Sequence, residues 1–569
     1  MPDVPAITNQ FDYLVPAEWE HDGRSAALAI GSRVRIQLHG RRIGGWVIGL
    51  DVEPPAGVEL LPLAKLSGHG PNAEVFELAE WIAHRWASSA TKVLRAASPP
   101  RNIASLPPRQ RVVVEAERPA SWVDPAFADA GAIVRIAPAA DRWPVVEAAL
   151  AFGNPLFIAP SVAMARQLAA RLRRTRVSTA LLPDDWARAA AGAAVVGTRS
   201  AALATVHEPG SVVVLDEHDD AMQEERTPTW HARDVALKRA GDWGVPCVLV
   251  SPTPTVDAQE RLPLIAPTRA EEFAGWPTVE LIDRRDEQPG RLGLFSDRLV
   301  TELRGDRRIA CILNRKGRAQ LLACNTCGEV VACDRCEASV RLDDDELICR
   351  RCAATRPVIC QSCGGMKLKN LRMGVSRARE ELEALVGEPV TEMTATSTHG
   401  SVDARVAVGT EALLHTGARF DTIVFLDIDQ ELLALRQRAA EQALGLLARA
   451  ARLVGTRAGG GRLIVQTRSP DHVVLRAAQT ANPSLAAEAD RDRRKLMNWP
   501  PFGAQAMVSG QAADAFIARF GTPLGVEIHG PSDGSWLLRS ADVATLADRL
   551  AEVKRPDGRL RIEVDPPGV

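Results

Sequence analysis

The chain of 569 residues lacks the segments that would place a protein in or across a membrane. It has no apolar run of about 20 residues, the length needed to span a bilayer. Its first residues, Met-Pro-Asp-Val-Pro, lack the basic and apolar regions of a signal peptide. We therefore expect a cytoplasmic protein with reduced cysteines and no membrane partner. The net charge of −2 gives no overall attraction to nucleic acid, so any DNA-binding surface has to be local.

A phosphate-binding loop is also missing. Such a loop needs G-x-x-x-x-G-K-[ST], because glycines let backbone N–H groups wrap the phosphates, and no Gly-Lys-Ser or Gly-Lys-Thr occurs in this chain. The stretch 137–143, ahead of an expected helix, carries proline and bulky side chains instead. Asp216 and Glu217 follow an apolar strand, where they could hold Mg²⁺ and position water. A solvated strand end explains them equally well. Because the phosphate loop is missing, the sequence predicts no ATP hydrolysis.

Cysteine is scarce but concentrated. Eight of the ten cysteines form four C-x-x-C pairs between residues 324 and 363: Cys324 and Cys327, Cys333 and Cys336, Cys349 and Cys352, Cys360 and Cys363. Each pair can present two thiolates to one tetrahedral zinc ion, so four pairs predict two structural four-cysteine zinc sites. Disulfides are the alternative, but oxidised frameworks are rarely built from evenly paired C-x-x-C turns.

Three pairings of the four C-x-x-C turns are possible. The segment 337–348 between the inner turns has apolar flanks around an acidic tip, which favours a short hairpin. A hairpin would bring Cys333, Cys336, Cys349 and Cys352 to one ion and leave Cys324, Cys327, Cys360 and Cys363 for the other.

The hydrophobic pattern predicts a multidomain α/β protein. Alternating residues in 32–38 and 42–49 indicate a hairpin in a β-rich N-terminal domain, 1–100. Short apolar runs alternating with helical patterns then indicate two parallel, helix-covered sheets, in 101–300 and 301–500. The cysteine module at 324–363 is inserted in the second. Residues 501–569 are expected to form a small α/β C-terminal domain.

Three clusters of basic residues are candidates for contact with nucleic acid. One lies in 367–379, directly after the cysteine module, and one in 491–495, before the aromatic residues Trp499 and Phe502. Cations there could neutralise phosphates and the aromatics could stack on bases, although a solvated basic face is as good an interpretation. The third, in 171–176, closes an expected helix, where cations also favour the helix dipole, and that structural interpretation is sufficient for it.

The ordered motifs resemble one family, the PriA replication-restart helicases. The match is carried by Leu313-Asn-Arg-Lys-Gly317, by the cysteine spacing, and by further segments in the family's order: 11–13, 31–36, 196–201, 231–234, 251–254, 427–429, 466–467, 500–502, 530–531 and 564–566. The resemblance implies two RecA-like helicase lobes with a two-zinc module in the second. It also implies that Phe11 and Asp12 grip a DNA 3′ end, although Asp12 is equally well explained as a turn residue.

The departures from the family concern the nucleotide site. The phosphate loop is replaced by 137–143, the DEEH box reads Asp216-Glu-His-Asp219, and the sixth helicase motif reads Arg449-Ala-Ala-Arg-Leu-Val-Gly-Thr456. Arg452 or Arg457 are candidates to replace its arginines, although their register does not fit. A winged-helix region also looks shortened. Asp216 and Glu217 therefore mark a vestigial nucleotide site, and the resemblance gives no catalytic residue here.

By resemblance, the chain is expected to bind forked or branched DNA and to promote primosome assembly without helicase activity. The implied cofactors are two Zn²⁺ ions. The implied partners are primosome proteins, single-stranded DNA-binding protein and the machinery that loads the replicative helicase. Two rival functions stay open: an ATP-driven 3′-to-5′ helicase with a non-standard nucleotide site, and a zinc-module scaffold without DNA affinity.

Overall fold

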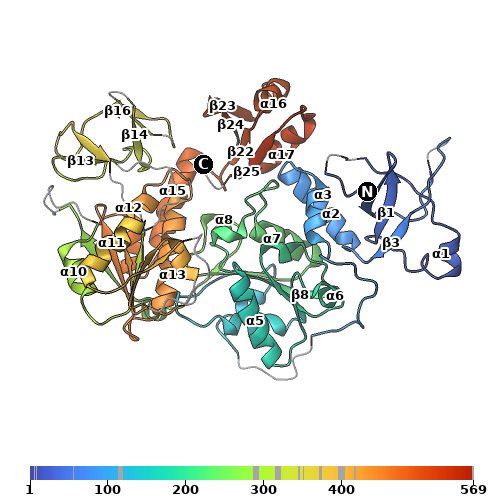
Figure 1. Cartoon of the computed structure of the whole chain (residues 1–569), viewed down its shortest axis with the longest axis horizontal. Helices are drawn as coiled ribbons and strands as arrows, with labels where there is room; N and C mark the ends of the chain where they lie inside the picture. The colour runs from blue at the N-terminus through green and yellow to red at the C-terminus, as the bar shows by residue number, and fades with distance from the viewer. Residues whose placement is uncertain are drawn as a thin grey trace.

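A computed structural model describes residues 1–566 except 6, 8, 55–56, 113–119, 286–293, 314–321, 344–345, 350, 371–374, 395–403 and 416–417. The segment Asn314 to Gly317 of the family motif therefore lies outside the described residues. Two parallel sheets form the centre of the molecule, with the N-terminal domain, the cysteine module and the C-terminal domain around them (Figure 1). In the described part of the chain, no helix combines the length and the apolar character needed to cross a bilayer.

The N-terminal domain is divided between two cores. Its antiparallel sheet β1 (Arg33–Leu38), β2 (Arg41–Trp46) and β3 (Lys65–Gly68) contains the expected hairpin and packs on Trp19 and Leu63. Helices α2 (Ala73–Arg85) and α3 (Ala90–Ala97) instead share a hydrophobic core with the first lobe and the C-terminal domain. Apolar residues at helical spacing on α2 therefore join this domain to the body.

The first lobe is built on a seven-stranded parallel sheet in the order β10-β4-β9-β8-β5-β7-β6. Strands made almost wholly of buried apolar residues are typical of parallel sheets covered on both faces. The strands are β4 (Ile133–Arg135), β5 (Asn154–Ile158), β6 (Thr179–Leu181), β7 (Ala194–Gly197), β8 (Pro209–Leu215), β9 (Cys247–Ser251) and β10 (Leu264–Ile265). The main helices around it are α4 (Trp143–Leu150), α5 (Val162–Arg174) and α7 (Ala232–Trp243).

The second lobe has a six-stranded parallel sheet in the order β11-β21-β20-β12-β19-β18. Its strands are β11 (Thr278–Asp283), β12 (Ile309–Ile312), β18 (Thr391–Met393), β19 (Val406–Gly409), β20 (Thr422–Phe425) and β21 (Arg462–Thr467). Helices α11 (Val375–Val386), α13 (Ala439–Val454), α14 (Val473–Gln479) and α15 (Pro483–Met497) accompany it. The fold class is thus as predicted: two parallel α/β lobes, a β-rich N-terminal region and two clusters of four cysteines.

The second sheet begins with strand β11, which lies ahead of the inserted cysteine module in the chain. Strand β11 pairs in parallel with β21 and forms an edge of the second sheet. The predicted domain boundaries themselves stay predictions. Between α3 and β4, the described residues contain one helical turn, Asp124–Phe127, before the first lobe begins.

Two small units complete the molecule. The cysteine module contains β13 (Leu322–Cys324) paired with β17 (Leu368–Asn370), and the sheet β14 (Val340–Asp343), β15 (Glu346–Cys349) and β16 (Thr355–Pro357). Its β14–β15 pair is the hairpin expected between the inner cysteine turns. The C-terminal domain is a four-stranded sheet with α16 (Ala513–Phe520) and α17 (Val543–Glu552); its strands are β22 (Ala504–Ser509), β23 (Val526–Ser532), β24 (Ser535–Ser540) and β25 (Arg561–Val564).

Candidate functional site

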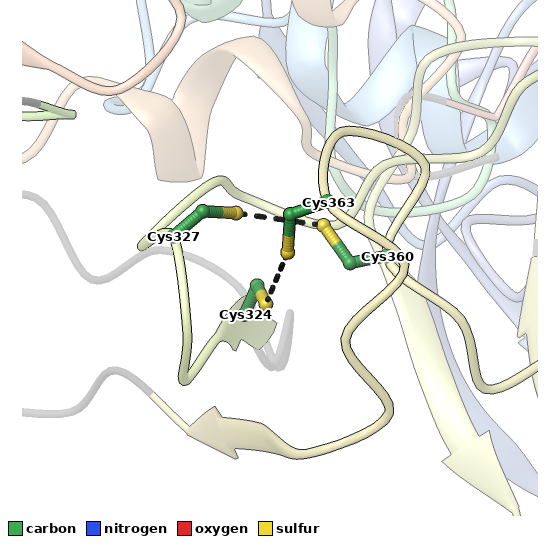
Figure 2. Close-up of side chains that lie close together, drawn as sticks. All are labelled: Cys324, Cys327, Cys360 and Cys363. Carbon is green, nitrogen blue, oxygen red and sulfur yellow. Dashed lines mark hydrogen bonds between the residues drawn. The ribbon is translucent and has the colours of Figure 1, made fainter.

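The eight clustered cysteines form two separate groups of four. In each group the sulfur atoms all lie within 4.8 Å of one another. The outer group contains Cys324, Cys327, Cys360 and Cys363, whose sulfurs point toward a common centre in Figure 2. The inner group contains Cys333, Cys336, Cys349 and Cys352. This is the grouping that the hairpin between the inner turns predicts.

The spacing of the sulfur atoms fits a metal ion rather than disulfides. The Sγ atoms of Cys324 and Cys363 are 3.5 Å apart, and those of Cys333 and Cys352 are 3.6 Å apart. Four sulfurs placed 2.3 Å from one tetrahedral ion would be about 3.8 Å apart, whereas a disulfide bond measures about 2.05 Å. The two clusters could therefore hold two metal ions, one each.

All four C-x-x-C turns close in the same way. In each turn the backbone N–H of the residue after the second cysteine donates to the carbonyl of the first, at 2.8–2.9 Å. That residue has a positive φ in every case: Gly328, Glu337, Ala353 and Gly364. Glycine adopts this conformation freely, while Glu337 and Ala353 adopt it against their Cβ atoms. N–H groups inside the turns also donate to Sγ of Cys324 and Cys333 at 3.4 Å, which favours thiolates.

One arginine fixes the module to the second lobe. The Arg351 guanidinium donates to the carbonyl of Cys336 at 3.0 Å within the module. It also donates to the carbonyls of Leu435 at 3.1 Å, Arg436 at 2.6 Å and Ala434 in the second lobe. Burial lowers the pKa of Arg351. The inner cluster is therefore anchored to the lobe, and the outer cluster is also joined to it, since Arg468 donates to the Gly328 carbonyl at 3.1 Å.

At the predicted nucleotide site, the loop before α4 leaves no nest for a phosphate. The Ala140 N–H donates to the Ala137 carbonyl at 3.0 Å, and the Ala139 N–H donates to the Gly275 carbonyl at 3.2 Å. At the start of α4, the Trp143 N–H donates to Asp141 Oδ1 at 3.0 Å, and Pro144 has no N–H. Because phosphate loops bind through free N–H groups at this point, these four positions offer no free N–H group to a phosphate.

Two arginines occupy the carboxylate of Asp216. Arg142 Nη2 lies 2.7 Å from Oδ1 of Asp216, and Arg452 lies 2.8 Å from Oδ2 and 2.9 Å from Oδ1. Arg452 comes from α13 of the second lobe and also donates to the Pro138 carbonyl at 3.2 Å. The Asp216 side chain is only 3% exposed. A carboxylate engaged by two guanidiniums has no free oxygen for Mg²⁺ without breaking these pairs.

Glu217, the second predicted residue, is also held internally. It accepts from the Thr255 N–H at 2.8 Å and from the Thr255 hydroxyl at 3.0 Å, and it lies 3.3 Å from Arg233. Burial raises the pKa of Glu217, and the Arg233 charge opposes that rise. Asp216 and Glu217 are neighbours in sequence but face different partners, so the structure does not bring them together as a metal-and-water pair.

The sequence predicted only some of the arginines that form contacts between the lobes. Of the two candidates considered there, Arg452 reaches the first lobe, whereas Arg457 lies over the Phe273 ring at 3.6 Å and donates to the Pro277 carbonyl. A third, Arg449, pairs with Asp219 at 2.6 Å and with Glu411. The signal was the i, i+3 spacing of Arg449 and Arg452, which places both on one face of a helix.

Phe11 and Asp12, the predicted DNA contacts, lie at the surface of the N-terminal domain. The Phe11 side chain is exposed and Asp12 is half-buried. Burial lowers the pKa of the Met1 amino group to about 6, and the nearby Asp12 charge opposes this shift. The adjacent Tyr13 hydroxyl donates to the Gln37 carbonyl at 2.9 Å, which ties this segment to β1.

Comparisons with known proteins find similarity along most of the chain. A family model for the PriA 3′DNA-binding domain (3′BD) matches residues 2–99. Among curated proteins, the chain is 28% identical over 573 residues to the "Probable replication restart protein PriA" of Mycobacterium tuberculosis (strain CDC 1551 / Oshkosh), covering 90% of this chain and 86% of that protein. It is 27% identical over 346 residues to the replication restart protein PriA of Bacillus subtilis (strain 168), covering 55% of this chain and 43% of that protein.

Coverage of other relatives is partial. The match to the replication restart protein PriA of Haemophilus influenzae spans 49% of its length, so the chain aligns with about half of this relative and of the Bacillus one. A DEAD box protein from Methanococcus jannaschii is similar with a TM-score of 0.30 and 9% identity, covering 63% of this chain and 88% of that one. A likeness this slight supports no conclusion. The chain is thus similar to the PriA 3′DNA-binding domain over residues 2–99 and, at 28% identity, to the mycobacterial protein over 90% of this chain.

Proposed function

We propose that this protein binds forked or branched DNA at stalled replication sites and promotes primosome assembly without ATP-driven unwinding. The observation that carries the proposal is the pairing of Asp216 with Arg142 and Arg452. A motor of this fold needs that carboxylate free for the metal ion of a nucleotide. Here it joins the two lobes through the protein's own side chains, so the helicase-like body serves as a fixed support.

In this proposal DNA recognition belongs to the N-terminal domain. The matched 3′DNA-binding domain model supports it. Asp12 would accept a hydrogen bond from a free 3′ hydroxyl while repelling a terminal phosphate, and Phe11 would lie against the last base. The module would act through its surface, with zinc in both four-cysteine clusters as the structural ion, because all-cysteine tetrahedral sites suit zinc. Exposed Ile359 and Met366 on the module are available to primosome proteins or single-stranded DNA-binding protein.

The test is a binding titration of the protein against a fork with a free 3′ hydroxyl, the same fork with a 3′ phosphate, and a linear duplex, across salt concentrations. We expect the fork with the free hydroxyl to bind most tightly, and this preference to persist as salt weakens the nonspecific phosphate contacts. Asp12→Ala should lose about tenfold in affinity for that fork, because a hydrogen bond to a charged group contributes about 1.5 kcal/mol.

The matched control is Glu53→Ala, which removes an exposed carboxylate of the same domain. It should leave fork binding unchanged. Equal affinity of the wild-type protein for fork and linear duplex would overturn the fork-recognition proposal. Absence of any DNA binding would instead favour a scaffold that acts through protein contacts alone.

A further inference from the structure

The described arginines of the two basic clusters that the sequence favoured for DNA form ion pairs within the protein. In the cluster 491–495, Arg491 pairs with Glu260 at 2.6 Å and Arg493 pairs with Glu337 at 2.8 Å. Arg494 is fully buried and pairs with Asp490 at 2.7 Å. These cations bind carboxylates of the protein, so they offer little charge to a phosphate backbone.

The cluster after the cysteine module has the same character. On α11, Arg377 pairs with Glu381 at 3.2 Å and Arg379 pairs with Glu383 at 2.8 Å. Both are contacts within one helix at the i, i+4 spacing. The described arginines of both clusters are therefore already paired. Lys367 and Lys495 in the same clusters are exposed.

The cluster at the end of α5 differs. Arg174 and Arg176 are exposed, and in the described part of the chain neither has a carboxylate within ion-pair distance. Their neighbour Arg173 pairs with Asp185 at 2.8 Å. Arg176 follows the helix in a left-handed conformation, with φ of 62°. This end of the helix therefore presents cations that the protein itself does not neutralise.

The connection from the N-terminal domain brings more cations to the same place. The Gln110 N–H donates to the Ala191 carbonyl at 2.6 Å, and the Ser178 hydroxyl donates to the Gln110 side chain. Arg188 Nη2 donates to the same hydroxyl at 3.3 Å. Arg109 and Arg111 flank Gln110 and are exposed, again with no carboxylate partner among the described residues.

The contacts of Gln110, Ser178 and Arg188 bring three arginine-bearing segments together at the β6 edge of the first lobe. We call the exposed arginines of these segments the edge patch: Arg109, Arg111, Arg174, Arg176 and Arg188. The members of the patch are all arginines, so the patch itself presents charge and no aromatic ring. The nearby Trp143 ring is covered by Arg171 at 4.0 Å, and its Nε1–H donates to Glu147 at 2.6 Å. Binding of single-stranded bases normally adds aromatic platforms to the basic groove. The edge patch therefore fits the phosphate backbone of a duplex.

The distance from the N-terminal domain to the edge patch is short. Ile103 is still bound to that domain, since the His69 N–H donates to its carbonyl at 2.8 Å. The six residues from Ile103 to Arg109 span at most about 22 Å when fully extended. This limit applies to the step from Ile103 to Arg109, which at about 3.4 Å per base pair equals roughly six base pairs of duplex.

We propose that the edge patch binds the phosphates of the double-stranded arm next to the 3′ end held by the N-terminal domain. This inference rests on the proposed 3′-end binding and assigns the path of the DNA beyond it. The first lobe thereby acts as a DNA-binding surface through its outer edge.

The test measures how the dissociation constant for a fork depends on salt. Each lost phosphate contact lowers the slope of log K against log salt by about 1. Arg174→Gln with Arg176→Gln should lower it by about 2, and adding Arg109→Gln with Arg111→Gln should lower it by about 4. The matched control is Lys554→Gln with Arg559→Gln, which removes two exposed cations of the C-terminal domain. That domain and α5 lie on opposite sides of the molecule in Figure 1.

A second measurement varies the length of the duplex arm. Wild-type affinity should rise with arm length until the duplex reaches the edge patch, and the quadruple variant should show no such rise. If the wild-type protein binds forks but the variant keeps its slope and its length dependence, or the control loses as much, the edge-patch proposal is wrong and 3′-end binding stands. If the wild-type protein binds no DNA, the proposed function itself fails.

Discussion

The cysteine module and the predicted nucleotide site are both regions that the family resemblance singles out, and their side chains are arranged in opposite ways. In the module, eight side chains converge on two centres with the spacing that a metal ion requires. At the nucleotide site, the protein's own arginines fill the space around Asp216, and the loop N–H groups donate to nearby carbonyl and carboxylate oxygens. A site whose ligands converge on a common centre is built to bind something, whereas a site whose ligands pair with each other has become part of the framework.

The largest effect should come from the module, because metal binding supplies its folding free energy. Cys336→Ser removes one ligand of the inner cluster. We expect the metal content to fall from two ions to one per chain, and the module to become open to proteases. Elemental analysis of the purified protein measures the first effect and limited proteolysis the second.

A suitable control is Cys247→Ala, which removes a buried cysteine that belongs to neither cluster. Its metal content should stay at two ions per chain. The account of the module fails if the wild-type protein holds no metal under reducing conditions, or if the Cys336 variant still holds two ions.

A smaller but clear loss of stability is expected at the nucleotide site. Asp216→Asn leaves Arg142 and Arg452 without their shared carboxylate. Breaking a fully buried pair costs about 3–5 kcal/mol, and partial exposure of the arginines reduces this to about 2–3 kcal/mol. Urea unfolding of the first lobe, followed by tryptophan fluorescence, measures the change.

Asp141→Asn serves as the comparison, because its pair with Arg171 is exposed on both sides. Exposed pairs contribute about 0–1 kcal/mol. A carboxylate kept free for a nucleotide would stabilise little, so equal effects of the two substitutions would contradict the framework role of Asp216.

The smallest effect concerns the turns of the module. Ala353 adopts a positive φ of 57° at the position where two of the other turns have glycine. Ala353→Gly should therefore slow metal loss to a chelator, with a gain of about 1 kcal/mol from relieved backbone strain. The same substitution at Ala354, which has no positive φ, should speed metal loss instead. The reverse order would show that backbone strain does not limit the stability of these sites.

Local patterns carried most of the fold prediction. Apolar runs such as Val212–Leu215 identify buried parallel strands, and the acidic tip between the inner cysteine turns identifies a hairpin, because both signals depend on neighbours in sequence. The spacing of the turns was enough to predict two four-cysteine groups. The packing of α2 and α3 on the first lobe was not predictable, since an amphipathic helix shows that it has a partner but not which one.

Contacts between distant segments account for what the sequence missed. Arg142, Arg452 and Asp216 lie far apart in the chain and meet only when both lobes fold. The ranking of basic clusters was limited for the same reason: a run of arginines shows charge, but only the structure shows that Arg491 and Arg493 have partners while, among the described residues, Arg174 and Arg176 have no carboxylate partner.

The most direct test of the central claim is ATP hydrolysis by a preparation that binds forked DNA and contains two metal ions per chain. With Asp216 held by Arg142 and Arg452, we predict no hydrolysis above background, with or without DNA. Turnover of a few molecules of ATP per second, stimulated by fork DNA and abolished by Asp216→Asn, would contradict the account and establish an active motor.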